Sequence, residues 1–177
     1  FPAFSKTFNG ISVSLGATFQ LNEHFYIKTN IARGYRAPNI TEFASNGLDP
    51  GAHIVYLGNK GFVPEFSLQE DIGIEWQHHT INFSIAVFNN NLQHYIYLSQ
   101  LTDANGNPLV NAQGNKTYQY QQSSAQLYGM EATVRIKPSF IKGFTYDNTF
   151  SVIYGYNRGI AFKGRGNNGE NLPLIPP

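Results

Sequence analysis

The chain reads FYIKTNIARGYRAPN from Phe25 to Asn39. Within this stretch, apolar side chains such as Ile27 and Ile31 alternate with polar or small ones, of which Lys28 is an example. A period of two residues places successive side chains on opposite faces of a β-strand. The stretch therefore predicts a strand with one apolar and one polar face, and this pattern decides the fold.

Six segments of the chain share this alternation. On each of them, apolar residues occupy one face and small, polar or charged residues occupy the other. The segments cover residues 11–21, 25–36, 68–77, 81–87, 128–136 and 144–156. Because no segment shows a sustained helical period, an all-β chain is expected.

The connections between these strands alternate in length. Short turns are expected at residues 22–24, 78–80 and 137–143, and long polar connections at residues 37–66, 99–117 and from 157 onward. Barrels of the outer-membrane type have short turns at one rim and long loops at the other. We therefore predict an antiparallel up-and-down transmembrane β-barrel segment of about six strands with long outer loops.

Six strands are too few to close such a barrel, because single-chain bacterial examples have about eight or more. An unclosed wall would also leave two unpaired edges, which lipid does not tolerate. Residues 1–177 are therefore expected to form one partial β-barrel domain of a larger protein.

Composition argues against several other classes of protein. Charged residues make up 13% of the chain and aromatic residues 15%, which is few charges for a soluble domain. No apolar run is long enough for a membrane-spanning helix. The chain has no Cys, so disulfides, thiolate metal sites and thiol nucleophiles are excluded. A net charge of +1 gives no electrostatic reason to expect nucleic acid as a partner.

Most charged residues of the predicted strands share the polar face. They are Lys28, Arg36, Asp71, Glu75, Glu131, Arg135 and Asp147. A charge on the lipid side of a barrel costs a few kcal/mol near the midplane, so these residues are expected to face the lumen. Lys28 and Glu75 occupy comparable heights on neighbouring strands, and Arg135 and Asp147 flank one short turn. Both pairs are expected to form across the strands.

Several short motifs occur in a fixed order along the strands. Tyr35-Arg36-Ala37-Pro38-Asn39 closes one strand, Pro64-Glu65 precedes the next, and further motifs lie at residues 70–75, 127–131 and 172–176. Together they resemble TonB-dependent outer-membrane receptors, in which a Phe-Arg-Ala-Pro box closes an outward strand and an Asn-Pro-x-Leu-x-Pro-Glu box opens the next one. Here Tyr35 replaces the Phe, and residues 58–65 keep only the Pro-Glu end of the second box.

The resemblance implies a 22-stranded barrel filled by a plug domain, with the plug and the C-terminal closing strand lying outside this chain. It implies a location in the outer membrane of a Gram-negative bacterium. It also implies active uptake of a scarce nutrient, such as an iron–siderophore complex, without a resident cofactor. The expected partners are outer-membrane lipid, the plug, the TonB energy-transducing system acting through that plug, and a small-molecule ligand.

Within such a receptor, the lumen-facing charged residues would contact the plug, pair with one another across the wall, or do both. In the family, residues placed like Arg36 and Glu65 support the geometry of loops and plug more often than they touch the substrate. The two boxes are therefore expected to mark the outer rim of the barrel.

Histidines provide one more candidate site. His53 lies between the two boxes, where haem-uptake receptors of the family carry an axial His ligand, so it is a candidate haem ligand. A solvated loop histidine is the other interpretation. His78 and His79 are adjacent and point to opposite faces, so no metal site is expected there.

Two further interpretations stay open. A soluble all-β carbohydrate-binding module would use Tyr56, Tyr118 and Tyr120 to stack on sugars, and its apolar faces would have to pack against one another. A small complete barrel, serving adhesion or an enzyme activity, would need eight strands. No Ser, His and Asp order carries the signature of a catalytic nucleophile, so an enzyme is not expected.

Overall fold

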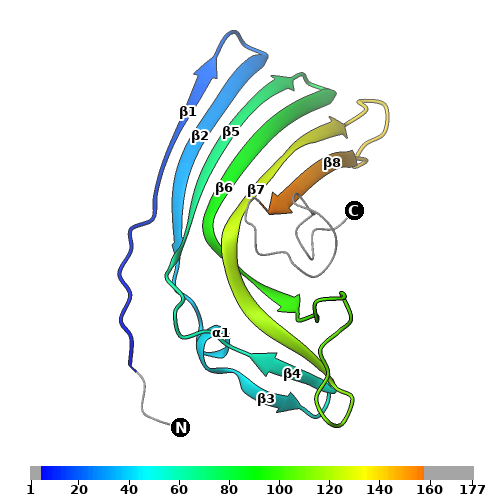
Figure 1. The fold of residues 1–177 in the computed structure, drawn as a ribbon. Coiled ribbons are helices and arrows are strands. Elements are labelled where there is room, and N and C mark those ends of the chain that lie inside the picture. The colour runs from blue at the N-terminus through cyan, green and yellow to red at the C-terminus, as the bar shows by residue number, and fades with distance from the viewer. Residues whose placement is uncertain (1–4, 158–177) are drawn as a thin grey trace.

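The computed structural model describes residues 5–157 as one curved β-sheet with a short helix near one end (Figure 1). The six long strands are β1 (Val13–Gln20), β2 (Phe25–Arg36), β5 (Glu65–Gln77), β6 (Ile81–Gln100), β7 (Lys116–Ile136) and β8 (Tyr146–Asn157). The expected all-β architecture is confirmed, and each of the six alternating segments overlaps one of these strands.

Neighbouring long strands pair in the order β1-β2-β5-β6-β7-β8, and each of these pairs is antiparallel. Ile27 of β2, for example, lies opposite Phe19 of β1 and Ile74 of β5. Because opposite residues share a face, the apolar residues of successive strands join into one continuous surface. Within the described residues the sheet is open, with β1 pairing only with β2 and β8 pairing only with β7.

Connection lengths are sorted by end, as the sequence predicts. The short turns between β1 and β2, β5 and β6, and β7 and β8 lie together at the upper end of the sheet in Figure 1. The long connections that follow β2 and β6 lie at the opposite end. We call this lower end in the figure the rim.

β6 and β7 continue toward the rim well beyond the residues where alternation is clear. A β-bulge interrupts their pairing between Leu92 and Tyr95, and His94 within it has a φ of 59°. A bulge inserts one unpaired residue, which bends the strand and reverses the side-chain parity beyond it. Figure 1 shows that both strands curve strongly as they approach the rim.

The connection after β2 is not a featureless loop. It contains α1 (Ile40–Ala44), β3 (Asn46–Asp49) and β4 (Ile54–Leu57). β4 pairs in parallel with residues 116–119 of β7, so the expectation of purely antiparallel pairing does not extend to this connection. β8 covers β7 only between residues 125 and 136, and β4 occupies part of the edge left open beyond it.

Three of the buried apolar residues, Phe43, Phe62 and Ile96, form a cluster at the rim. No helix within residues 5–157 is long and apolar enough to cross a membrane. The motif at residues 172–176 and most of the final polar connection lie outside the described residues.

Candidate functional site at the rim and on the polar face

Arg36, at the end of β2, bridges two carboxylates. Its Nε donates to Glu65 Oε2, and its Nη1 donates to Glu42 Oε1 at 2.9 Å and to Oε2 at 3.2 Å. Glu65 is its register partner on β5, whereas Glu42 belongs to α1. Both glutamates are only 7% exposed, so their charges depend on Arg36 and on nearby N–H donors. We call these three residues the rim cluster.

Glu42 also caps the helix that contains it. Its backbone N–H donates to Asn39 Oδ1 at 2.9 Å, and its Oε2 accepts from the Asn39 backbone N–H at 2.8 Å. This reciprocal pair is a capping box, which satisfies two donors at the start of α1. Pro38 is buried immediately before it. The Arg36-to-Asn39 motif thus turns the chain from a wall strand into a helix, and Arg36 ties that helix back to the wall.

The Pro64-Glu65 motif is joined to the neighbouring strands beyond the bulge. Glu65 Oε1 accepts from the backbone N–H of Ile96 on β6. Gln122 of β7 reaches the same region, because its Nε2 donates to Val63 O at 2.7 Å and to His94 O at 2.8 Å. Polar contacts therefore join four strands, β2, β5, β6 and β7, to the connection that follows β2. The carboxylate of Glu65 lies among these contacts.

A small apolar core lies beside the rim cluster. Phe43 of α1, Phe62 of the connection and Ile96 of β6 are its buried members, and Phe62 is only 2% exposed. The rings of Phe43 and Phe62 lie 6.3 Å apart between centroids. Gly58 approaches so closely that a Cβ there would lie 2.6 Å from the Phe43 carbonyl carbon. We call Phe43, Phe62 and Ile96 the rim core.

The polar face carries a ladder of side-chain interactions along the wall. Lys28 pairs with Glu75, and Arg135 Nε donates to Asp147 Oδ1 at 2.6 Å, so both predicted pairs are confirmed. Asp71 accepts from Asn30 Nδ2 at 3.0 Å. Most charges on this face are thus neutralised across the strands.

Glu131 differs from the other charged residues of the polar face. It lies between Ala86 of β6 and Ser151 of β8, and neither neighbour offers a positive charge. Among residues 5–157 it has no ion-pair or hydrogen-bond partner. Its carboxylate is therefore available to bind a group outside the described part of the chain.

The opposite, apolar face is exposed along much of the wall. Leu15 is 74% exposed and Phe150 is 58% exposed, although both are large apolar side chains. The carbohydrate-binding interpretation requires such faces to pack against one another, and they do not. Of its proposed sugar platform, Tyr56 and Tyr118 lie opposite one another, whereas Tyr120 packs against the rim core.

Two charged residues interrupt the apolar face, and the sequence analysis did not assign them. Arg33 lies opposite Val13 and Leu68, and Glu70 lies opposite Ile31, so both share the face of these apolar residues. Strand alternation alone is enough to place them, because each is an even number of residues from apolar residues of its own strand. The rule that strand charges face the polar side therefore has these two exceptions.

The rings of His24, His78 and His79 lie close together in the short turns, apart from His53, and the His78 and His79 rings are 5.5 Å apart rather than on opposite faces of a strand. His53 is exposed in the turn between β3 and β4, with a φ of 54°. The rings of His24 and His78 lie 5.9 Å apart at the short-turn end of the sheet. Residues 5–157 contain no group of three or more His, Asp or Glu side chains arranged to hold a metal ion.

Comparison with known proteins decides the family. A family model described as the TonB dependent receptor-like β-barrel matches residues 2–177. The chain belongs to this receptor family. The probable TonB-dependent siderophore receptor PirA of Acinetobacter baumannii is 27% identical over 168 residues, which cover 82% of this chain and 22% of that protein. The ferric enterobactin receptor of Pseudomonas aeruginosa is 27% identical over 142 residues, covering 71% and 18%.

Solved structures agree on the fold of this receptor chain. The copper transporter OprC superimposes with a TM-score of 0.67 at 17% sequence identity, covering 93% of this chain and 22% of the transporter. The chain thus spans about a fifth of the length of the proteins it matches, between 18% and 22% for these three. The open sheet is the corresponding part of a larger barrel wall.

Tyr35 marks where this TonB-dependent receptor chain departs from the family box. Its ring lies 5.7 Å from that of Phe66, its register partner on β5. Tyr35 therefore preserves the aromatic contact that a Phe would make at the same position. Its hydroxyl is buried and has no hydrogen-bond partner among the described residues.

Proposed function

We propose that this chain forms wall strands and outer loops of a Gram-negative outer-membrane receptor that takes up an iron–siderophore complex with energy from TonB. The observation that carries the proposal is the opposition of the two faces of the sheet. One face exposes large apolar side chains such as Leu15 and Phe150, and the other carries an ionic ladder. The names of the relatives, a siderophore receptor and a ferric enterobactin receptor, support the class of substrate.

In this mechanism the apolar face contacts lipid and the polar face lines the lumen around the plug. The rim cluster and rim core hold the loop after β2 against the outer end of the wall, so that this loop presents a defined surface. The iron complex binds to outer loops and plug. TonB, driven by the inner-membrane proton gradient, then moves the plug so that the ligand can pass, as in the family that the chain belongs to.

Plug contact is assigned to the polar face. Lys28, Asp71, Glu75, Arg135 and Asp147 already have partners within the wall, and they supply a polar surface against which a plug can pack. Glu131 is the residue proposed to accept a hydrogen bond or a positive charge from the plug. No resident cofactor and no catalytic group is assigned.

Uptake of radioactive iron as ferric enterobactin tests the proposal. A strain lacking the full-length gene should lose uptake, the complete gene should restore it, and removal of TonB should abolish it again. Glu131→Lys in the full-length receptor should reduce uptake while leaving the protein folded in the outer membrane. Unchanged uptake in the deletion strain, or restored uptake without TonB, would refute the proposed function for this ligand.

Haem is a second candidate ligand. A probable haemoglobin-binding and haemoglobin-haptoglobin-binding protein of Haemophilus influenzae is 25% identical over 156 residues, covering 88% of this chain and 14% of that protein. His53 is exposed and lies on the loop between the two boxes. Growth on haem as the iron source that depends on His53, measured with His53→Ala, would favour haem over a siderophore.

A further inference from the structure

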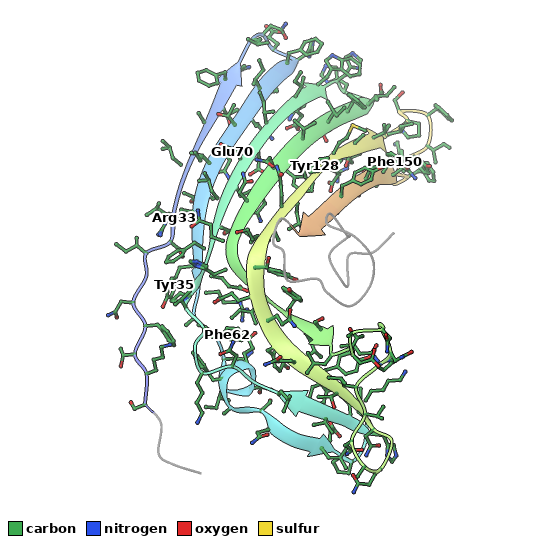
Figure 2. The ribbon with its side chains drawn as sticks, in the orientation of Figure 1. Arg33, Tyr35, Phe62, Glu70, Tyr128 and Phe150 are labelled. Atoms are coloured by element: carbon green, nitrogen blue, oxygen red, sulfur yellow. The ribbon has the colours of Figure 1, made fainter. Side chains whose placement is uncertain are left out.

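Arg33 occupies an unusual position on the wall. It lies on the apolar face of β2, opposite Val13 of β1 and Leu68 of β5. Figure 2 shows the labelled residues in the order Glu70, Arg33, Tyr35 and Phe62 from the short-turn end to the rim. The charge therefore lies between the apolar part of the wall and the rim, on the side that the proposed function turns toward lipid.

The guanidinium of Arg33 is held in place but not neutralised. Its Nη1 donates to the backbone carbonyl of Ile11 at 2.8 Å, and its Cζ lies 4.3 Å from the centroid of the Phe66 ring. No carboxylate within residues 5–157 forms an ion pair with it. A guanidinium has five N–H donors in a planar fork suited to two oxygens of one anion. Most of these donors are left for a ligand.

A hollow adjoins this side chain. It has a volume of about 630 Å³ and is lined in part by Arg33, Phe66, Leu68, Asn91, Gln93 and Ser124. By strand pairing and alternation these six residues share the apolar face. The other three lining residues, Ser67, Leu92 and Ala125, alternate with them along β5, β6 and β7. The hollow thus combines one cation with amide and hydroxyl groups that can donate to oxygen atoms.

The depth of the hollow matches an interface between lipid and water. Phe25 begins β2 at the short-turn end, and Arg33 comes eight residues later. Eight residues span about 26 Å along a strand, or about 20 Å along the axis of a barrel whose strands are tilted. An apolar band of such a barrel is about 25 Å tall. A cation costs a few kcal/mol at the middle of the band but little near its edge. Arg33 lies near that outer edge.

We propose that Arg33 and the hollow beside it bind the phosphate of a lipid headgroup in the outer leaflet. The inference rests on the proposed function, because it takes the apolar face to be the lipid face. The guanidinium fork binds the phosphate oxygens, the Phe66 ring and the Ile11 carbonyl keep the fork in position, and the amides of Asn91 and Gln93 contact the polar groups around the phosphate. The acyl chains extend from there along the exposed apolar face.

A soluble anion is a poorer occupant than a lipid. Arg33 and the five lining residues named with it lie on the face opposite to Lys28 and the rest of the polar ladder, so a ligand moving through the lumen does not reach their side chains. Only Arg33 supplies positive charge there, and beyond Glu70 and Asn89 the surface toward the short-turn end is apolar. A molecule that carries both a phosphate and apolar chains is complementary to both parts of this surface.

Glu70 opposes this binding and provides an internal check. It lies on the same face two residues along β5 from Leu68, and its Oε2 accepts from Asn89 Nδ2 at 3.1 Å. Its negative charge repels a phosphate bound at Arg33. Glu70→Gln is isosteric and removes that repulsion, so it should strengthen binding by about twofold to fivefold.

The test uses the full-length receptor in a non-ionic detergent and measures bound lipid by native mass spectrometry. Phosphatidic acid, phosphatidylcholine and inorganic phosphate are the probes. We expect the receptor to retain phosphatidic acid in preference to phosphatidylcholine, and Arg33→Gln to weaken retention about tenfold or more, as for loss of a charge-assisted hydrogen bond. Arg33→Lys keeps the charge without the guanidinium fork, so its lipid retention should lie between that of the wild type and that of Arg33→Gln. Lys60→Gln, which removes one positive charge from an exposed loop residue, should leave retention unchanged.

Four results would overturn the inference. They are equal retention by wild type and Arg33→Gln, an equal loss in Lys60→Gln, weaker binding in Glu70→Gln, and displacement of the lipid by millimolar inorganic phosphate, which would indicate a site for free anions. If Arg33→Gln does not fold, Arg33→Lys and Glu70→Gln still decide the matter. Ferric enterobactin uptake separates the two proposals. Normal uptake with unselective lipid binding refutes only the headgroup site, whereas absence of the receptor from the outer membrane refutes the proposed function as well.

Discussion

The rim and the wall of this sheet are held together in different ways. At the rim, Phe62 is 2% exposed, and two buried glutamates share one arginine. Along the wall, Leu15 is 74% exposed and Phe150 58%, and the ion pairs lie on the surface of an open sheet. The rim therefore supplies its own core from this chain, whereas the wall depends on strand pairing within the chain and, in the proposed function, on lipid around it.

The largest difference between the two regions is expected for removal of an aromatic ring. Phe62→Ala should destabilise the rim by about 4 kcal/mol, because a buried ring is replaced by a cavity. Phe150→Ala on the apolar face should cost less, about 2 kcal/mol, since the ring loses its transfer from water into lipid but leaves no cavity behind. Hydrogen exchange of the rim amides Asn59 and Ile96 in the full-length receptor measures the first effect, and detergent-resistant folding measures the second. An equal loss of stability in the two variants would contradict the proposed difference between rim and wall.

A smaller effect is expected at the rim cluster. Arg36→Met leaves the carboxylates of Glu42 and Glu65 buried without their shared cation. Removing one partner of a fully buried ion pair lowers the free energy of unfolding by several kcal/mol. Because the Arg36 side chain is 44% exposed, we expect a smaller loss of about 2 kcal/mol. Proteolysis of the loop between β2 and β5 should become faster at neutral pH. Arg36→Lys keeps the positive charge but not the guanidinium fork, so it should lower the stability of the rim less than Arg36→Met does. A rim as resistant as wild type in Arg36→Met would contradict the bridging role.

The wall pair provides the matched surface case. Arg135→Gln removes an ion pair whose side chains are 48% and 50% exposed, so the cost should be below about 1 kcal/mol. High salt should remove most of this difference, because exposed charges are screened. Thermal unfolding of the full-length receptor at low and high salt is the measurement. A loss as large as that of Arg36→Met, or one that persists in high salt, would show that the wall pair is more than a surface contact.

The smallest effect concerns the turn between β6 and β7. The backbone N–H of Asn107 donates to Asp103 Oδ1 at 2.8 Å, and this bond, with the Asn107 side chain, holds the pKa of Asp103 below its ordinary value. A lowered pKa in the folded turn stabilises it above the pKa of the unfolded chain. That stabilisation is lost as pH falls through the folded value. Carboxyl NMR titration should show the pKa of Asp103 rising in Asn107→Ala. The exposed control Gln113→Ala should leave it unchanged.

The wall could be predicted from sequence because its information is local. A period of two assigns each side chain to a face wherever the strand is regular. Comparable heights on adjacent strands predict the Lys28–Glu75 pair, and positions on either side of one short turn predict the Arg135–Asp147 pair. Arg33 and Glu70 are exceptions to the expectation that strand charges face the polar side, although the same alternation places both on the apolar face. The observed register corrects that expectation.

The rim was predicted less completely. Asn39 and Glu42 have the spacing of a capping box, so the sequence does carry a signal for the start of α1. No comparable signal exists for Phe43 and Phe62, which stand as single aromatic residues in a polar connection. The parallel pairing of β4 with β7 is also invisible in sequence, since it depends on where β8 stops covering the edge of β7.

By itself the sequence determined that this chain is an antiparallel wall with an apolar face, a polar face and loops sorted by end. Tertiary structure alone decided that Arg36 links α1 to β5, that Glu65 reaches the N–H of Ile96 beyond a bulge, and that Arg33 lies free of any carboxylate among the described residues. The physical reason is the range of the interactions. Alternation is set by the geometry of each strand, whereas the contacts of the rim join segments that only the curvature and register of the whole sheet bring together.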